Sequence, residues 1–368
     1  LAKAFRLLAA EGPAAFYYGP IGEAVVAAVN RAGGDMSMKD LNDYKMIIQE
    51  PVMGTYRGYS IYSTPPASSG GTHIVQLLNI MENFPVAQWK HNSPEYLHYL
   101  AEAMKMVFAD RQRYMADTAF VDVPLAGLAS KEYAKQLAEK ITRYNVMQEV
   151  LPGDPWQFDG GKKTAYIGHD GNKHISTSSF SVVDSDGNIV ASTNTVNYFF
   201  GSGVIVPEYG FVLNNEMDDF AQDPASVNAP EPGKRPLSSM SPTIVLDPEG
   251  RPFMSLGSAG AMRIITAMSQ IIMNVVDFGM TMDEAIEQPR IFNVASSGKA
   301  GKLLVEGGID PATVMYLQFR GHNIDERARG GYFGTAQGIL INYAKGMHQH
   351  GRINGGADSR RLGVPVGF

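Results

Sequence analysis

The sequence changes character near residue 176, and this change constrains the fold more than any other feature. Residues 1–145 contain mainly segments with helical periodicity, whereas the residues after 176 contain short β-forming runs separated by turn signals. Between them, residues 151–173 are polar and rich in Gly and Pro, which is typical of an exposed connection. We therefore expect two parts with different secondary structure, which meet near residue 176.

Local signals mark several elements. The longest predicted helix begins at Ser93-Pro94, an N-cap residue followed by proline at the first helical position, and it carries an apolar stripe to Phe108. Residues 52–62 alternate enough to predict one strand. The other segments predicted as helices are 22–32, 74–81, 131–141 and, in the second part, 262–276 and 282–287.

Composition excludes several classes of protein. The chain has 368 residues, which suits two or three domains or one large intertwined one, and its formal charge of −6 gives no basic surface for nucleic acid and no polybasic patch for a membrane. No run reaches the roughly 18 apolar residues of a spanning helix. The absence of cysteine excludes disulfide scaffolds, Cys-ligated zinc and thiol nucleophiles. The eight histidines show no metal-ligand spacing, so we predict no metal and no cofactor.

Residues 177–197 have the pattern of a strand, an Asp-Gly turn and a returning strand. Facing residues of an antiparallel hairpin have a constant sum of residue numbers, so a loop of three or five residues centred on Asp186 places Thr195 opposite Thr177. A two-residue loop pairs Thr177 with Val196 instead and turns the two hydroxyls to opposite faces. Thr and Ser are also ordinary residues on a β surface, and both registers stay open.

A second segment, Leu256 to Ala261, has the pattern of a strand that ends in a loop of small residues before a helix. The backbone N–H groups at such a helix start suit a developing oxyanion or a phosphate, although small residues also serve tight strand–helix packing. A Walker loop is excluded because no Gly-Lys-Ser/Thr follows. Residues 214–220 and 234–242 combine polar groups with apolar anchors, as binding loops do.

Taken together, these motifs make the chain similar to the γ-glutamyltranspeptidase family, in that family's order and at close to its spacings. Two further segments, 65–80 and 101–111, resemble the helical part of the family's large subunit. The motifs that carry the resemblance are TSSFSVVDSDGN (177–188), GSGV (201–204), LNNEMDDF (213–220), KRPLSSMSPTIV (234–245) and GSAGAMRIIT (257–266).

The resemblance implies an N-terminal-nucleophile hydrolase with an α+β fold, a four-layer αββα sandwich. In that family one precursor cleaves itself into a heterodimer, here between Ser176 and Thr177. Residues 1–176 would be the C-terminal part of the large subunit, and residues 177–368 the small subunit. The chemistry is plausible by itself, because a Thr hydroxyl needs a base and a newly exposed α-amine has a pKa of about 7.7–8.0.

The resemblance also assigns roles to single residues. Thr177 matches the nucleophile, and Thr195 matches the second threonine that orients it. Gly260 and Ala261 match the Gly-Gly pair whose N–H groups form the oxyanion hole; the second Gly is replaced, but Ala keeps the N–H. The residues that match groups holding the substrate's α-amino and α-carboxylate ends are Asn197, Glu216, Asp219, Ser238 and Ser239.

Three departures from the family pattern bear on function. The stretch Ala221 to Gly233 is short, which resembles members that accept bulky or polymeric substrates. The usual Thr-Thr-His start is Thr-Ser-Ser here. The family's large subunit extends beyond anything that matches Leu1, so we expect that this chain starts within a longer protein, and that the family's carboxylate-binding arginine precedes it. Arg263 and Arg360, taken as isolated surface residues, are the possible substitutes.

We therefore expect a γ-glutamyl hydrolase or transferase that acts on glutathione or a related γ-glutamyl compound, with water, an amine or a peptide as acceptor. A poly-γ-glutamate depolymerase and a glutaryl-cephalosporin acylase are alternatives within the class. A truncated, inactive fragment that binds only a ligand or partner is an alternative of another class. The resemblance implies a periplasmic or extracellular location, although the chain itself carries no targeting signal.

Overall fold

The computed structural model describes residues 1–160, 177–296, 298–343 and 352–367. They form two compact units that are interleaved along the sequence. Unit 1 contains Leu1–Glu50 and Thr195–Glu216, and unit 2 contains the described residues of Pro51–Lys173, Thr177–Asn194 and Met217–Phe368. The predicted division into residues 1–176 and 177–368 concerns cleavage, and it stays a prediction. No helix among the described residues is long and apolar enough to cross a lipid bilayer.

Unit 1 is a small helical unit with its own apolar core. Its core side chains include Ile21, Val25 and Val206. A Cβ on Gly22 would lie 2.3 Å from the Phe16 carbonyl oxygen, so only glycine allows this close packing. The elements of unit 1 are α1 (Ala2–Glu11), α2 (Ala14–Tyr17), α3 (Pro20–Arg31), α4 (Met38–Asn42), β5 (Ile205–Val206) and β6 (Phe211–Val212), and the short η3 (Glu216–Asp219) follows at its boundary.

Unit 2 is built around one antiparallel sheet. Within the described residues the sheet has six strands in the order β1-β2-β7-β8-β14-β15. The centre of the sheet is the most buried part, since every residue from Met254 to Ala259 is buried. The strands are β1 (Val52–Tyr56), β2 (Tyr59–Ser63), β7 (Thr243–Leu246), β8 (Pro252–Ala259), β14 (Thr335–Asn342) and β15 (Arg352–Ala357).

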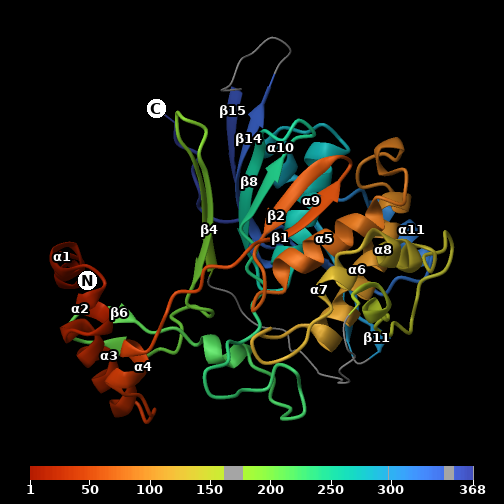
Figure 1. Ribbon diagram of the computed structural model, residues 1–368. Coiled ribbons are helices and arrows are strands. Elements are labelled where there is room, and N and C mark those ends of the chain that lie inside the picture. The colour runs from red at the N-terminus through yellow and green to blue at the C-terminus, as the bar shows by residue number, and fades with distance from the viewer. Residues whose placement is uncertain (161–176, 297, 344–351, 368) are drawn as a thin grey trace. The chain divides into compact units, whose positions relative to one another are not determined.

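Helices pack on one face of this sheet, as Figure 1 shows for α5, α9 and α10. Nearly all residues of α5 (Gly70–Met81) and α9 (Arg263–Val276) are buried, so they form a central layer rather than a solvated surface. Helix α10 (Met282–Glu287) lies close to β14 and β15, where Cβ atoms on Gly338 and Gly356 would meet Met282. Helix α6 (Pro94–Tyr114) packs on α5, and Ser93 caps it as predicted.

A two-stranded hairpin, β3 (Thr177–Val183) and β4 (Ile189–Thr195), stacks on the centre of the sheet. Ser255 Oγ donates to Ser181 Oγ at 2.9 Å. A Cβ on Gly257 would lie only 2.9 Å from Ser179 Cβ, so glycine allows the hairpin to approach β8. Along β3 every second residue is exposed, as expected for a strand that covers the sheet with one face.

One predicted element was wrong, and some elements were not predicted. Residues 52–62 form a hairpin rather than one strand, because the chain reverses at Arg57-Gly58, where both residues have positive φ. Helix α11 (Pro311–Phe319) was not predicted, although Asp310 caps it and Pro311 opens it. The remaining elements are α7 (Leu125–Leu128), α8 (Lys131–Ala138), β9 (Ile291–Phe292), β10 (Ala295–Ser296), β11 (Lys299–Ala300), β12 (Leu303–Glu306), β13 (Ile324–Arg327), η1 (Val86–Gln88), η2 (Pro155–Phe158) and η4 (Gly331–Phe333).

Candidate active site

Thr177 is the first residue of β3, and the stacking of the hairpin places it near the end of β8. Ser181 contacts Ser255, and Ser179 lies next to Gly257. These two contacts show that β3 runs antiparallel to β8. Two residues before Ser179 on β3 and two residues after Gly257 on β8, Thr177 therefore comes towards Ala259. The Thr177 carbonyl oxygen also accepts a hydrogen bond from Arg361 Nη1 at 3.4 Å. The predicted nucleophile is therefore half-buried at the point where β8 ends.

The turn Gly260-Ala261 directly follows β8 and precedes α9. The Gly260 carbonyl accepts from Arg263 N at 3.0 Å, and the Ala261 carbonyl accepts from Ile264 N at 2.9 Å. Since these residues come before the first turn of a buried helix, their N–H groups lie at its positive end, which favours a developing negative charge. Ala261 has φ of 48°, the left-handed region that glycine adopts more easily.

The hairpin loop fits one of the two predicted registers. Asp184 N donates to the Asn188 carbonyl at 3.1 Å, and the Asp184 side chain accepts from Asn188 N at 2.8 Å. This pair closes a three-residue loop centred on Asp186 and has the sum of residue numbers that the first register requires. That Thr195 lies opposite Thr177 stays a prediction.

Ser238 and Ser239 are held by the segment before α5. The Ser238 carbonyl accepts from Ser69 N at 2.9 Å and from Ser69 Oγ at 2.8 Å. Arg111, which is 2% exposed, donates from Nε to Ser69 Oγ at 2.8 Å and from Nη2 to Ser239 Oγ at 3.1 Å. Because an arginine only donates, Ser239 accepts here and keeps its hydroxyl hydrogen for another acceptor, such as a carboxylate. Sequence reasoning assigned no role to Ser69 or Arg111.

The remaining predicted substrate-binding residues lie around η3 and in unit 1. In unit 1, Asn197 N donates to Thr195 Oγ1 at 2.8 Å, and Asn197 Nδ2 donates to the Asn215 carbonyl at 3.2 Å. Glu216 N donates to the Asn214 side chain at 3.0 Å. In unit 2, the Asp219 carbonyl accepts from Asn228 Nδ2 at 2.8 Å. Ser176, on the other side of the predicted cleavage site, lies outside the described residues.

The two arginines considered as substitutes for the family's carboxylate-binding residue are buried, so the expectation of surface residues was wrong. Arg360 is bound to Glu306 and Asp358, and its side chain is 0% exposed. Arg263 is 3% exposed, and its guanidinium carbon lies 3.8 Å from the centre of the Tyr332 ring. Both side chains belong to the interior of unit 2, and neither contributes a surface cation.

One buried cluster among the described residues has the composition of a metal site: His98, Glu102 and His322. His98 Nε2 donates to the Thr142 carbonyl at 2.8 Å, which leaves His98 Nδ1 to accept from His322 Nε2 at 2.9 Å. The Lys105 ammonium lies 2.7 Å from Glu102 Oε1 and occupies the carboxylate that a cation would need. The two histidines are 224 residues apart, so spacing could not reveal the cluster.

A second buried network joins α5 to α6 and α8. His73 Nδ1 donates to Gln76 at 2.7 Å, and Gln76 and Tyr133 donate to the Asp110 carboxylate at 2.6 and 2.7 Å. Burial lowers the pKa of His73 to about 3 and raises the pKa of Asp110 to about 6. His73 is therefore neutral near pH 7.

The fold is that of an N-terminal-nucleophile hydrolase, the αββα class. The chain superposes on the cephalosporin acylase from Bacillus halodurans with a TM-score of 0.82 and 27% sequence identity. The match covers 100% of this chain and 62% of that chain.

The chain belongs to the γ-glutamyltranspeptidase family, whose sequence profile matches residues 1–368. It is 36% identical over 370 residues to the glutathione hydrolase proenzyme of Bacillus subtilis strain 168, and 37% identical over 374 residues to that of Escherichia coli K12. These matches cover 100% and 98% of this chain but 61% and 60% of the relatives. The chain thus spans about three fifths of the length of these relatives.

Proposed function

We propose that this chain is the catalytic part of a γ-glutamyl hydrolase or transferase whose nucleophile is Thr177, released by cleavage after Ser176. One observation carries the proposal. The stacking of β3 on β8 leads Thr177 towards Ala259, directly before the Gly260-Ala261 turn at the start of α9. A hydroxyl nucleophile and backbone N–H donors are the two parts that acyl transfer needs, and family membership supports the assignment.

In the proposed reaction, the α-amine of Thr177 takes the hydroxyl proton while Oγ1 attacks the γ-amide carbonyl carbon of the substrate. The Gly260 and Ala261 N–H groups stabilise the oxyanion that forms. Collapse breaks the C–N bond, the leaving amine takes the proton, and an acyl ester on Thr177 remains. Water or an amine acceptor then attacks this ester and regenerates the hydroxyl.

Family membership supports roles for the substrate-binding residues as well. Asn197, Glu216 and Asp219 would hold the α-amino and α-carboxylate ends of the γ-glutamyl group, and their acidic side chains suit the ammonium. Ser238 and Ser239 would donate to the α-carboxylate, and the hydrogen bond from Arg111 favours this role for Ser239. The proposed substrate is glutathione or a related γ-glutamyl compound. The two cleavage products would stay together as a heterodimer, and the enzyme would act in the periplasm or outside the cell.

One denaturing gel tests the nucleophile. The wild-type chain is expected to give fragments of 176 and 192 residues, with Thr177 at the new N-terminus. Thr177→Ala is expected to stay in one piece, and Thr177→Ser is expected to be cleaved more slowly. Ser178→Ala is the matched control, because Ser178 is the exposed neighbour, and its cleavage should be unchanged. Equal cleavage of T177A and the wild type would refute the proposal.

A second candidate is a glutaryl acylase, and the superposition on a cephalosporin acylase favours it. The two candidates differ in whether the substrate carries an α-amino group. Release of p-nitroaniline from a γ-glutamyl anilide and from a glutaryl anilide distinguishes them, since these probes differ only in that group. Preference for the glutaryl anilide would establish the acylase, and cleavage of the chain without turnover of either anilide would indicate an inactive fragment.

A further inference from the structure

The loop after β15 brings an arginine to the proposed nucleophile. Arg361 Nη1 donates to the Thr177 carbonyl oxygen at 3.4 Å, although 184 residues separate the two. The half-buried side chain packs on Gly331, where a Cβ would lie 3.1 Å from Arg361 Nε. The segment that starts at Gly331 also reaches the Gly260-Ala261 turn, because a Cβ on Gly260 would lie 3.0 Å from Gly334 Cα. Residues 331–334 thus connect Arg361 to Gly260.

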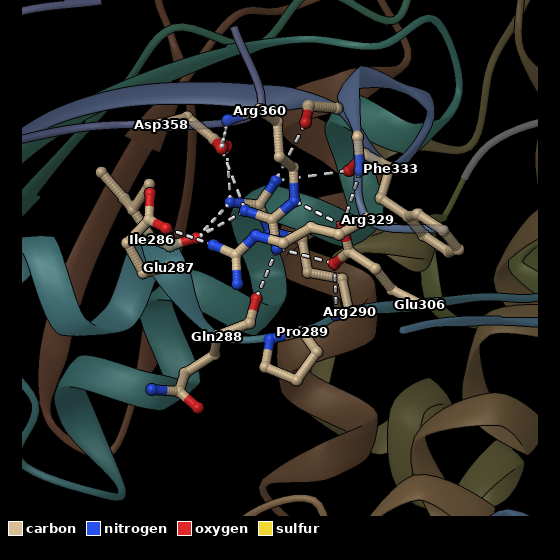
Figure 2. A network of polar contacts seen from close by, with 12 residues as sticks. Ile286, Glu287, Gln288, Pro289, Arg290, Glu306, Arg329, Phe333, Asp358 and Arg360 are labelled. Carbon is tan, nitrogen blue, oxygen red and sulfur yellow. Dashed lines mark hydrogen bonds and ion pairs between the residues drawn. The ribbon is translucent and has the colours of Figure 1, made fainter. Parts of the chain in front are cut away.

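Figure 2 shows what holds the backbone before Arg361. Asp358 is fully buried, and it accepts from Arg290 Nη2 at 2.8 Å and from Arg360 Nη1 at 3.0 Å. Arg360 also donates twice to Glu306, at 2.6 Å each. Since breaking a buried ion pair leaves an uncompensated charge, this network fixes residues 358–360. Arg361 N then donates to the Asp358 carbonyl at 3.3 Å, so Arg361 starts from a rigid base.

The charged and titratable groups on the described elements that pack against β3 come from few places. The described strands that pack on β3 are β4, β8 and β14, and none of them carries an ionisable side chain. The segment η4 and helix α9 carry the ionisable groups Tyr332 and Arg263, which contact each other. Asp358 and Arg360 neutralise each other within their network. Arg361 is a cation that contacts the Thr177 backbone directly.

We infer that Arg361 is a positioning residue, which holds the Thr177 main chain and keeps the α-amine released by cleavage in its neutral form. The inference rests on the proposed function, because this amine acts as the base only after cleavage. A neighbouring cation disfavours a second positive charge, so it lowers the pKa of an ammonium group. Only the neutral amine can accept the Thr177 hydroxyl proton, so Arg361 increases the fraction of active enzyme near neutral pH.

The test is the pH dependence of kcat/KM for a γ-glutamyl anilide, measured on the cleaved enzyme. Its acid limb reports the pKa of the essential base in the free enzyme. In Arg361→Met the limb is expected to move to higher pH by about half a unit or more, whereas Arg361→Lys keeps the charge and should keep the limb near its wild-type position. Arg352→Met removes an exposed arginine from β15 and is the matched control.

An R361M enzyme that is active with an unchanged acid limb would overturn the inference and leave the proposed function intact. Inactivity of the wild type, or normal turnover by T177A, would instead refute the proposed function. If R361M is not cleaved, Arg361→Gln provides a second uncharged variant. Cleavage of R361K but of neither uncharged variant would support a role of the cation. Failure of R361K as well would overturn the inference, because packing on Gly331 rather than charge would then be essential.

Discussion

At the scale of single residues, Ala261 is in a conformation that suits glycine. Its φ of 48° costs an L-residue roughly 1 kcal/mol or more. We expect Ala261→Gly to raise the free energy of unfolding by about 0.5–1 kcal/mol in urea denaturation, because glycine adopts this φ without strain. The same variant should keep kcat/KM within about twofold, since the N–H that serves the proposed oxyanion hole remains.

Ala259 is the matched control for this prediction, because it lies two residues earlier in an extended strand. Ala259→Gly should lower the free energy of unfolding, since glycine within a strand costs roughly 0.5–1 kcal/mol. If both glycine variants destabilised the chain equally, the left-handed conformation of Ala261 would carry no strain.

Arg111 gives a second prediction at this scale. Its guanidinium donates to Ser69 and Ser239 through two different nitrogens, an arrangement that a lysine ammonium cannot reproduce. We expect Arg111→Lys to lower the free energy of unfolding by about 1–3 kcal/mol, because buried hydroxyls lose charged donors. The measurement is urea denaturation, with Arg113→Lys, on the less buried side of the same helix, as control. Equal stability of the two variants would contradict the role given to Arg111.

At the scale of elements, the stacking of the β3–β4 hairpin depends on Gly257. A Cβ there would lie 2.9 Å from Ser179 Cβ and 3.2 Å from Thr193 Oγ1, so the hairpin would have to move. We expect Gly257→Ala to lower the free energy of unfolding by about 1–3 kcal/mol, the usual cost of overpacking, and to slow cleavage before Thr177. Unfolding in urea and the time course of cleavage on a gel measure the two effects.

Gly307→Ala is the control for this variant. A Cβ at Gly307 would meet its nearest atom at 3.6 Å, an ordinary contact, and its φ is not positive. It should therefore change neither stability nor cleavage by much. If G257A behaved like G307A, close approach of the hairpin to β8 would not be needed to place Thr177.

Elements with local signals could be predicted from the sequence, whereas their long-range contacts could not. The start of α6 was predicted because Ser93 caps the helix with its own side chain. The reversal at Arg57-Gly58 was missed because the two strands of the hairpin expose the same face of the sheet. The alternation of polar and apolar residues therefore continues from one strand into the next. Helix α11 was missed although Asp310-Pro311 is a start signal, since its nine residues show little amphipathic pattern.

At the scale of the whole molecule, the difference between local signals and long-range contacts decides which residues of the candidate site could be predicted. Motifs in the sequence predicted roles for Thr177, Gly260 and the serines 238 and 239, each within its own segment. The structure adds Arg111 and Arg361, whose contacts with Ser239 and Thr177 span 128 and 184 residues. Neither arginine has a local pattern that distinguishes it from a surface residue. Only the fold, which brings α6 and the C-terminal loop to these segments, shows what the two arginines hold.

Buried histidines set how the stability of the whole molecule depends on pH. Burial lowers the pKa of His73 and of His322 to about 3, and it also lowers the pKa of His98. Below about pH 6.5 these side chains take up protons in the unfolded chain but not in the folded chain, so acid favours unfolding. Asp110 acts in the opposite direction below pH 6, because burial raises its pKa to about 6 and the folded chain then binds the proton.

Burial also raises the pKa of Glu102 and Asp277, and it lowers the pKa of His91. Since four such histidines stand against three such carboxyl groups among the described residues, we expect the free energy of unfolding to fall as the pH decreases from 6.5 to 4. His322→Asn should reduce this slope by up to about 1.4 kcal/mol per pH unit, the contribution of one proton, because its amide can still donate to His98 but does not titrate. The measurement is urea denaturation between pH 4 and 8, in the T177A background so that cleavage does not change the molecule. Above pH 7 the two stability curves should run parallel. A slope unchanged by H322N below pH 6.5 would contradict this account, since His322 would then be protonated equally in the folded and unfolded chains.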